Sequence, residues 1–132
     1  MSLRLKTEDA FATYLSASAT KPSGYVVQAG HRIADLQLPA VVVHAEQGEP
    51  VVDGSLSQER KVTVNFSVMT PVETASVATT HRAAFQWLND RLSGTTALST
   101  VTFMGGYFGQ ESTGNSDKVM QDGLAYTAFV RP

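Results

Sequence analysis

The sequence predicts a single α+β domain in which a mainly antiparallel β-sheet of four to six strands packs against an N-terminal helix and a central helix. Residues 61–69 alternate apolar and polar side chains, which is the period of a half-buried strand. Residues 77–92 place apolar side chains at helical spacing. The other predicted strands lie on both sides of this one helix instead of alternating with helices, which favours α+β over a parallel doubly wound sheet.

The first helix is predicted to begin at Thr7, because a threonine hydroxyl is a good N-cap and two acidic residues follow at the positive end of the helix dipole. Phe11, Tyr14 and Leu15 form its apolar stripe. The breaker cluster at residues 21–24 contains a proline and a glycine and is expected to end the helix.

Two strands are predicted before the central one. Residues 25–29 are rich in β-forming side chains and lie between glycines, and residues 38–45 form an apolar run typical of a buried strand. Residues 31–37 show no clear period and are predicted to be a loop. The strands at 38–45 and 61–69 are expected to pair antiparallel, although their connection is longer than hairpins prefer.

The central helix is predicted to have Thr74 as its N-cap and Gly94 as the residue that ends it. After this helix, residues 98–104 alternate and predict a strand with mixed faces. Residues 105–116 are rich in glycine and polar side chains and are predicted to be a loop. Residues 124–130 form the last predicted strand.

Composition limits the class of protein. A chain of 132 residues that is 42% hydrophobic and 17% charged suits one domain, residues 1–132, and the low charge suggests that neighbours cover part of its surface. With no cysteine there is no disulfide framework and no thiolate metal site. A net charge of −2 without a basic cluster argues against tight nucleic-acid binding. No apolar run suits a membrane span or a secretion signal, so we expect a soluble protein that is not exported.

The side chains that usually carry chemistry form no recognised motif. His31, His44 and His81 lack partners at metal-ligand spacing, and His81, on the core-facing row of its helix, is expected to be structural. The acidic residues of the long connection match no calcium loop, and no serine lies in a nucleophile elbow. The sequence therefore predicts no catalytic residue, no metal site, no cofactor and no enzyme activity.

Three runs carry a resemblance to one family. They are a strand that starts with Leu-Pro at residues 38–46, a polar-alternating strand at residues 60–68 and a helix at residues 80–88. With the order of elements over residues 5–130, these runs resemble the middle of the tail terminator (tail completion) proteins of tailed bacteriophages. This family has no catalytic signature, so the resemblance implies a structural virion protein.

The resemblance further implies a ring, expected to be a hexamer, on the head-proximal end of a finished tail tube. Such a ring ends tube polymerisation and forms the docking surface for the head connector. Its partners would be other copies of itself, the tail tube protein and a head-tail connector or stopper protein, with DNA passing through the lumen without specific binding and no membrane involved. Its location would be the virion tail or neck, and the host cytoplasm during assembly.

Two other functions stay open at this point. A head-completion or neck protein would also be a structural part of the head-tail joint. A small-molecule binding module or an enzyme of α+β type would need a deep pocket that gathers His44, His81 and an acid. Imaging of the virion distinguishes a neck protein from a tail terminator. A pocket that contains these groups would favour a binding module or an enzyme.

The predicted contact regions are the long connection at residues 46–59 and the glycine-rich tip at residues 105–117, because loops on a rigid scaffold commonly carry binding sites. Edge strands offer a second kind of contact, and residues 51–52 or the final strand are predicted to add to a neighbour's sheet. The candidate interface residues are Glu49, Val51, Val52, Asp53, Tyr107 and Phe108.

Overall fold

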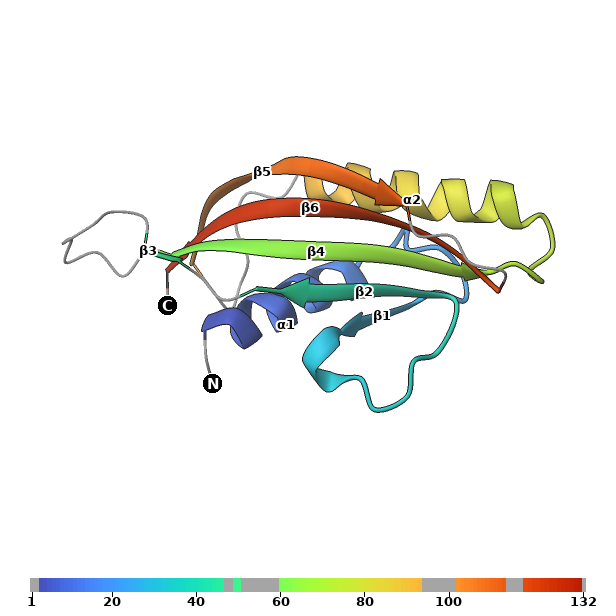
Figure 1. Cartoon of the computed structure of the whole chain (residues 1–132), viewed down its shortest axis with the longest axis horizontal. Coiled ribbons are helices and arrows are strands. Elements are labelled where there is room, and N and C mark those ends of the chain that lie inside the picture. Colours follow the sequence, from blue (N-terminus) through green and yellow to red (C-terminus); the bar gives the residue numbers. More distant parts are fainter. Residues whose placement is uncertain (1–2, 47–48, 51–59, 94–101, 114–117, 132) are drawn as a thin grey trace.

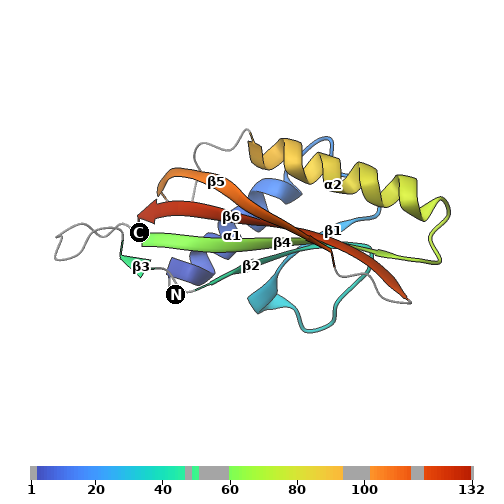
Figure 2. The same cartoon turned by 45° about the horizontal axis from the view of Figure 1, so that its top comes forward.

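The computed structural model describes residues 3–46, 49–50, 60–93, 102–113 and 118–131. These residues form two layers, one sheet and a pair of helices that cover the same face of it (Figure 1 and Figure 2). The helices are α1 (Leu3–Ser16) and α2 (Val77–Ser93), with a short 3-10 helix, η1 (Gly30–Arg32). The strands are β1 (Val26–Ala29), β2 (Ala40–Ala45), β3 (Glu49–Pro50), β4 (Arg60–Pro71), β5 (Thr102–Thr113) and β6 (Val119–Arg131).

The described strands build one six-stranded sheet in the order β1-β2-β4-β6-β5, with β3 paired to β4. β1 and β2 are parallel, and the other described pairs are antiparallel. The predicted α+β class with a mainly antiparallel sheet is therefore confirmed. The predicted antiparallel pairing of 38–45 with 61–69 is also confirmed, with Ala40 opposite Met69 and Ala45 opposite Val64.

Strand β4 shows why the sheet has one buried face. The side chains of Val62, Val64, Phe66 and Val68 are fully buried, whereas those between them are not. Because successive side chains of a strand point to opposite faces, all the buried ones meet the helices. β6 pairs with β4 along the length of β4, and its own buried side chains continue the same face.

Phe11 joins the helix layer to the sheet. It is fully buried, and its ring packs edge-on against Phe66 of β4 and Tyr126 of β6, with ring centroids 5.4 Å and 5.9 Å away. The two helices also contact each other directly. The Tyr14 hydroxyl donates to the Arg91 carbonyl at 3.0 Å, and the Arg91 guanidinium carbon lies 4.6 Å from the centre of the Tyr14 ring.

The predicted central helix at 77–92 is confirmed as α2, but both predicted N-caps are wrong. α1 begins at Leu3, so Thr7 lies inside the helix, where its hydroxyl donates to the Leu3 carbonyl at 2.8 Å instead of capping. α2 begins at Val77, and Thr74 lies in the turn before it, too early to cap the helix. The predicted helix end at Gly94 lies outside the described residues. Neither described helix is long and apolar enough to cross a membrane.

The glycine-rich stretch differs most from the prediction. Residues 105–113 were expected in a loop, but they belong to β5, which pairs with β6 over its length. The register shifts between Phe103 and Gly105 and between Phe108 and Gln110. Such irregularities are where a strand tolerates glycine, so glycine content alone did not identify a loop.

The edges of the sheet also differ from the expectation. The final strand β6 lies between β4 and β5, so the prediction that it adds to a neighbour's sheet is wrong. In the described strand order β1-β2-β4-β6-β5, the two outermost strands are β1 and β5. The predicted strand at 25–29 is confirmed as β1, and the predicted loop at 31–37 begins inside η1.

Truncation of Phe66 tests the importance of this core. Phe66→Ala is expected to lower the free energy of unfolding by roughly 3–5 kcal/mol, because it removes the ring that Phe11 packs on and leaves a cavity. Denaturant unfolding followed by the fluorescence of the single tryptophan, Trp87, measures this change. Val72→Ala is the control, since Val72 is 40% exposed and its truncation should change stability little. Equal effects of the two substitutions would contradict the described core.

Candidate functional site

A buried carboxylate on α1 gathers the N-terminal elements. Glu8 is fully buried, and its Oε1 accepts a hydrogen bond from the His31 backbone N–H at 2.6 Å and lies 2.7 Å from His31 Nδ1. Its Oε2 accepts from the Ala45 backbone N–H at 2.9 Å and lies 3.9 Å from His44 Nδ1. One side chain therefore holds α1, η1 and the end of β2 together.

The surroundings of Glu8 favour its charged form. Burial raises the pKa of this carboxyl, but the backbone N–H groups of Ala45 and His31 and the His31 side chain lower it by more. The net result is a pKa below the ordinary value of 4.5. Glu8 is therefore ionised at neutral pH, and the hydrogen bonds that it accepts are charge-assisted.

The next residue of α1 forms a second, more exposed pair with η1. Arg32 Nε and Nη2 donate to the two carboxylate oxygens of Asp9, each at 2.7 Å. This hydrogen bonding lowers the pKa of Asp9 and raises the pKa of Arg32. Because the Arg32 side chain is 59% exposed, solvent screens the pair and it adds little to stability.

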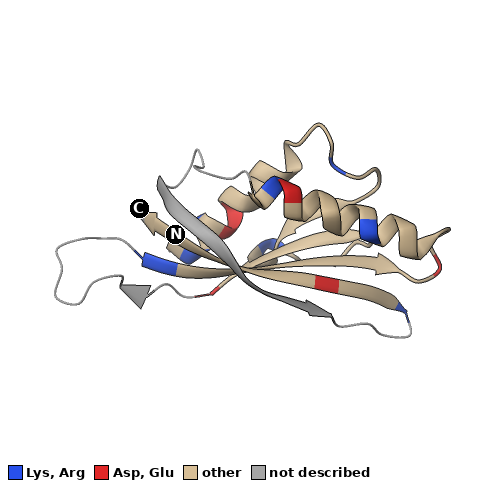
Figure 3. Ribbon diagram, turned by 90° about the horizontal axis from the view of Figure 1, so that it is seen from above, with Lys and Arg blue, Asp and Glu red and all other residues tan. Residues whose placement is uncertain are grey.

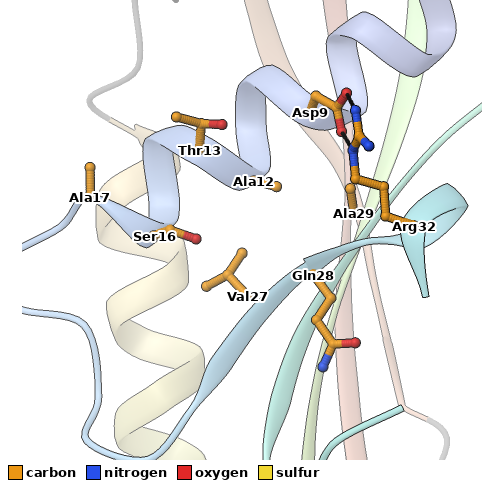
Figure 4. A pocket seen from close by; sticks show the side chains of 9 residues that line it. All are labelled: Asp9, Ala12, Thr13, Ser16, Ala17, Val27, Gln28, Ala29 and Arg32. Carbon is orange, nitrogen blue, oxygen red and sulfur yellow. Dashed lines mark hydrogen bonds and ion pairs between the residues drawn. The ribbon is translucent and has the colours of Figure 1, made fainter. Parts of the chain in front are cut away.

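An open groove lies between α1 and strand β1 (Figure 4). Its volume is about 720 Å³, and Val27 points into the space between helix and strand while the Asp9–Arg32 pair closes one end. Neither His44 nor His81 lines it, so it is not the pocket that a histidine-based active site would need. The lining residues are Asp9, Ala12, Thr13, Ser16, Ala17, Val27, Gln28, Ala29 and Arg32.

A second buried polar network surrounds His81 of α2, which is 3% exposed. Its Nδ1 lies 2.8 Å from Thr70 Oγ1, and its Nε2 lies 2.7 Å from Asp122 Oδ2. The Thr70 hydroxyl also shares a hydrogen bond with the Tyr25 hydroxyl. The network therefore ties α2 to β4, to β6 and to the residue before β1. Among the described residues, no three His, Asp or Glu side chains are grouped to hold a metal ion.

The predicted interface residues lie in different places. Glu49 belongs to β3 and pairs with Lys61 of β4. Tyr107 and Phe108 lie within β5 and pair with β6, so the prediction that they lie at a loop tip is wrong. The positions outside the described residues are Val51, Val52 and Asp53. Sequence reasoning missed Glu8 and the groove, since neither forms a motif along the chain.

Removing the charge of Glu8 should destabilise the protein in a pH-dependent way. At pH 7, Glu8→Gln is expected to cost roughly 2–3 kcal/mol, because an amide cannot accept all the charge-assisted hydrogen bonds. The folded pKa lies below 4.5, so the carboxylate stabilises the fold above about that pH and this contribution is lost as the pH falls through the folded pKa. The difference between wild type and variant should therefore shrink in acid.

Denaturant unfolding between pH 3 and pH 7 measures this difference. Glu73→Gln is the matched control, because Glu73 is exposed in the turn before α2. A Glu8→Gln cost that stays constant over this pH range would contradict the assignment of the charged form.

Removing the Thr70 hydroxyl tests the His81 network. Thr70→Val keeps the shape but leaves Tyr25 and His81 without their shared partner, so it is expected to cost roughly 1–3 kcal/mol. Thr63→Val on the other face of the same strand is the control and should not destabilise. Thermal unfolding of both variants measures the effect, and an unchanged melting temperature for Thr70→Val would show that the network contributes nothing.

Comparison with known proteins gives a structural match only. No protein-family model matches the chain, and no curated protein matches it. A solved structure described as the virion of a native gene transfer agent (GTA) particle contains a chain with the same fold, at a TM-score of 0.67 and 18% sequence identity. The match covers 99% of this chain and 100% of that chain. At this level of identity the match establishes that the two chains share a fold.

Proposed function

We propose that this protein is a structural subunit of a phage-like virion that caps the head-proximal end of the tail tube as a ring. In this role it ends tube polymerisation and forms the docking surface for the head connector. The single observation that carries the proposal is the match to a chain of the gene transfer agent virion over 99% of this chain and 100% of the other. The resemblance of residues 38–46, 60–68 and 80–88 to tail terminators supports the position within the virion.

The construction of the sheet supports a role in an assembly. Both helices cover one face of the sheet. On the opposite face of β4 and β6, most described side chains are partly exposed and few are charged. Among the described side chains of these two strands, Lys61 is the one Lys, Arg, Asp or Glu on that face. A broad face with few charges suits contact with other subunits better than permanent contact with water.

The distribution of charge supports passage of DNA without tight binding. Among the residues whose side chains the structure describes, Lys and Arg lie on α1, η1, β4 and α2 and at Lys21 and Lys118, and they do not gather into one stripe (Figure 3). The chain has a net charge of −2. Tight binding of DNA needs many contacts between basic side chains and phosphates, and this surface supplies few.

The buried polar groups support a structural role rather than catalysis. The hydroxyl of Thr70 and the imidazole of His81 are buried and already bonded to one another, so neither is open to a substrate. Glu8 is likewise occupied by hydrogen bonds from η1 and β2. In the proposed ring the protein uses no cofactor and no metal, and its partners are its own copies, the tail tube protein and a connector or stopper protein.

Three of the sequence-derived interface candidates acquire a structural setting in this proposal. Glu49 lies on β3, beside the first residues of β4, and Tyr107 and Phe108 lie on the outermost described strand β5. Val51, Val52 and Asp53 of the connection remain candidates on the sequence alone. Contacts through β5 would use the strand edge as well as side chains.

Removing this protein from particles that carry it tests the proposed function. Without it, tail tubes are expected to grow past their normal length and to stay unattached to heads, because nothing stops polymerisation. Electron microscopy of the particles measures tube length and attachment. Unattached tails of normal length would instead indicate a head-completion or neck role, and normal particles would refute a virion role altogether.

A further inference from the structure

The outer edge of β1 opens onto the groove beside α1. The Val26 backbone N–H donates to the Pro39 carbonyl at 3.2 Å, in the parallel register that places Val26 opposite Ala40. In a parallel ladder alternate residues bond to the same neighbour, so the N–H and C=O of Val27 point away from β2. No described strand pairs with that side of β1. The groove thus borders an edge with backbone groups that another strand can pair with.

The other end of the sheet offers a strand of the opposite direction. β1 is parallel to β2, and the following pairs, β2 with β4, β4 with β6 and β6 with β5, are all antiparallel. β1 and β5 therefore run in opposite directions. A rotation about an axis parallel to the strands keeps the direction of every strand. When such a rotation relates two copies, the β5 edge of one copy therefore meets the β1 edge of the next as an antiparallel pair.

We infer that a second copy of this chain adds its β5 edge to β1, so that one subunit's sheet continues into the next. The added strand then lies along the outer edge of β1, beside the groove between α1 and β1. The contact is head-to-tail, because it joins two different edges, and such contacts generate a ring when the rotation closes. This inference rests on the proposed ring and assigns its lateral contact.

The charges of the two edges agree with this pairing. The charged side chains that line the groove, Asp9 and Arg32, neutralise each other through their bidentate pair. β5 has Glu111 as its one charged residue among 12. A strand with one charge that meets a groove whose own charges are paired leaves at most that one charge, Glu111, to be accommodated at the contact.

The small size of the contact predicts how the ring assembles. β1 has 4 residues, whereas a stable interface between two proteins commonly buries roughly 800 Å² on each side. A pair of copies should therefore be weak, and a closed ring, in which every copy makes the contact twice, should be much more stable. We expect analytical ultracentrifugation to find monomers and rings without a stable dimer.

Disulfide trapping tests the pairing, because the chain has no cysteine of its own. Gln28→Cys on β1 is combined in turn with Tyr107→Cys, Gln110→Cys or Ser112→Cys on β5. These three positions pair with Thr127, Ala125 and Gly123 of β6 and so sample three registers on one face. Mild oxidation should give a ladder of covalent multimers for at least one pair.

The control for trapping places the first cysteine elsewhere. Gln86→Cys on the exposed side of α2 is combined with the same three β5 cysteines and should give no ladder. Absence of a ladder for all three Gln28→Cys pairs, or an equal ladder with Gln86→Cys, would overturn the proposed contact.

Variants that block the edge give a second, independent measurement. Val27→Pro removes an N–H that points away from β2, and Ser16→Trp fills the groove from an exposed position of α1. Each should raise the concentration at the monomer–ring midpoint at least tenfold. The melting temperature of Ser16→Trp should stay close to that of wild type, whereas Val27→Pro also loses packing against the core and should melt lower while remaining folded at the temperature of the assay. Ala83→Trp, on an exposed position of α2, is the control and should leave the midpoint unchanged. Rings that form normally from both folded variants would overturn the proposal.

Failure of this contact and failure of the proposed function give different results. If wild type forms rings on tail tubes but the Val27→Pro and Ser16→Trp variants also do, the lateral contact lies elsewhere and the terminator role stands. If the Gln28→Cys pairs form trapped multimers but wild type is absent from tails, the contact stands and the terminator role fails. A wild-type chain that is monomeric at every concentration, together with cysteine pairs that form no trapped multimer, overturns the contact.

Discussion

The carboxylate of Glu8 is the interaction on which the N-terminal half of the structure depends. A buried ionised carboxyl is costly unless hydrogen bonds satisfy it, and here the backbone N–H groups of His31 and Ala45 do so. These bonds fix η1 and the end of β2 against α1. The position of η1 in turn places Arg32 beside Asp9 at one end of the groove. The shape of the groove thus follows from one buried charge.

The sequence predicts those parts of the fold in which apolar residues recur at regular spacing. Alternation in residues 61–69 and helical spacing in residues 77–92 identify β4 and α2, because burial of one face imposes those periods directly. Glu8 could not be recognised, since an acid near a helix start has a simple local explanation and its actual partners lie 23 and 37 positions away. Of β5, only residues 102–104 were predicted to be a strand, because pairing with β6, and not their own composition, makes the glycine-rich residues 105–113 a strand.

A sheet whose two described helices lie on the same face suits the assembly role proposed above. The helices and that face of the sheet form the described apolar core, with Phe11 packed on β4 and β6. In the proposed ring, the opposite face and the two outermost described strands make the contacts between subunits. Because β1 and β5 differ in length and direction, one copy's edges are unlike each other, which favours head-to-tail rings over symmetric dimers.

The Thr70, His81 and Asp122 side chains show why geometry alone does not make an active site. They have the order of hydroxyl, imidazole and carboxylate that nucleophilic enzymes use. A nucleophile must reach a substrate, however, and Thr70 is 0% exposed with its hydroxyl already shared with Tyr25. The same chain of bonds instead holds α2 on the sheet from three sides. In this protein, the buried polar groups therefore fix the positions of the two helices on the sheet.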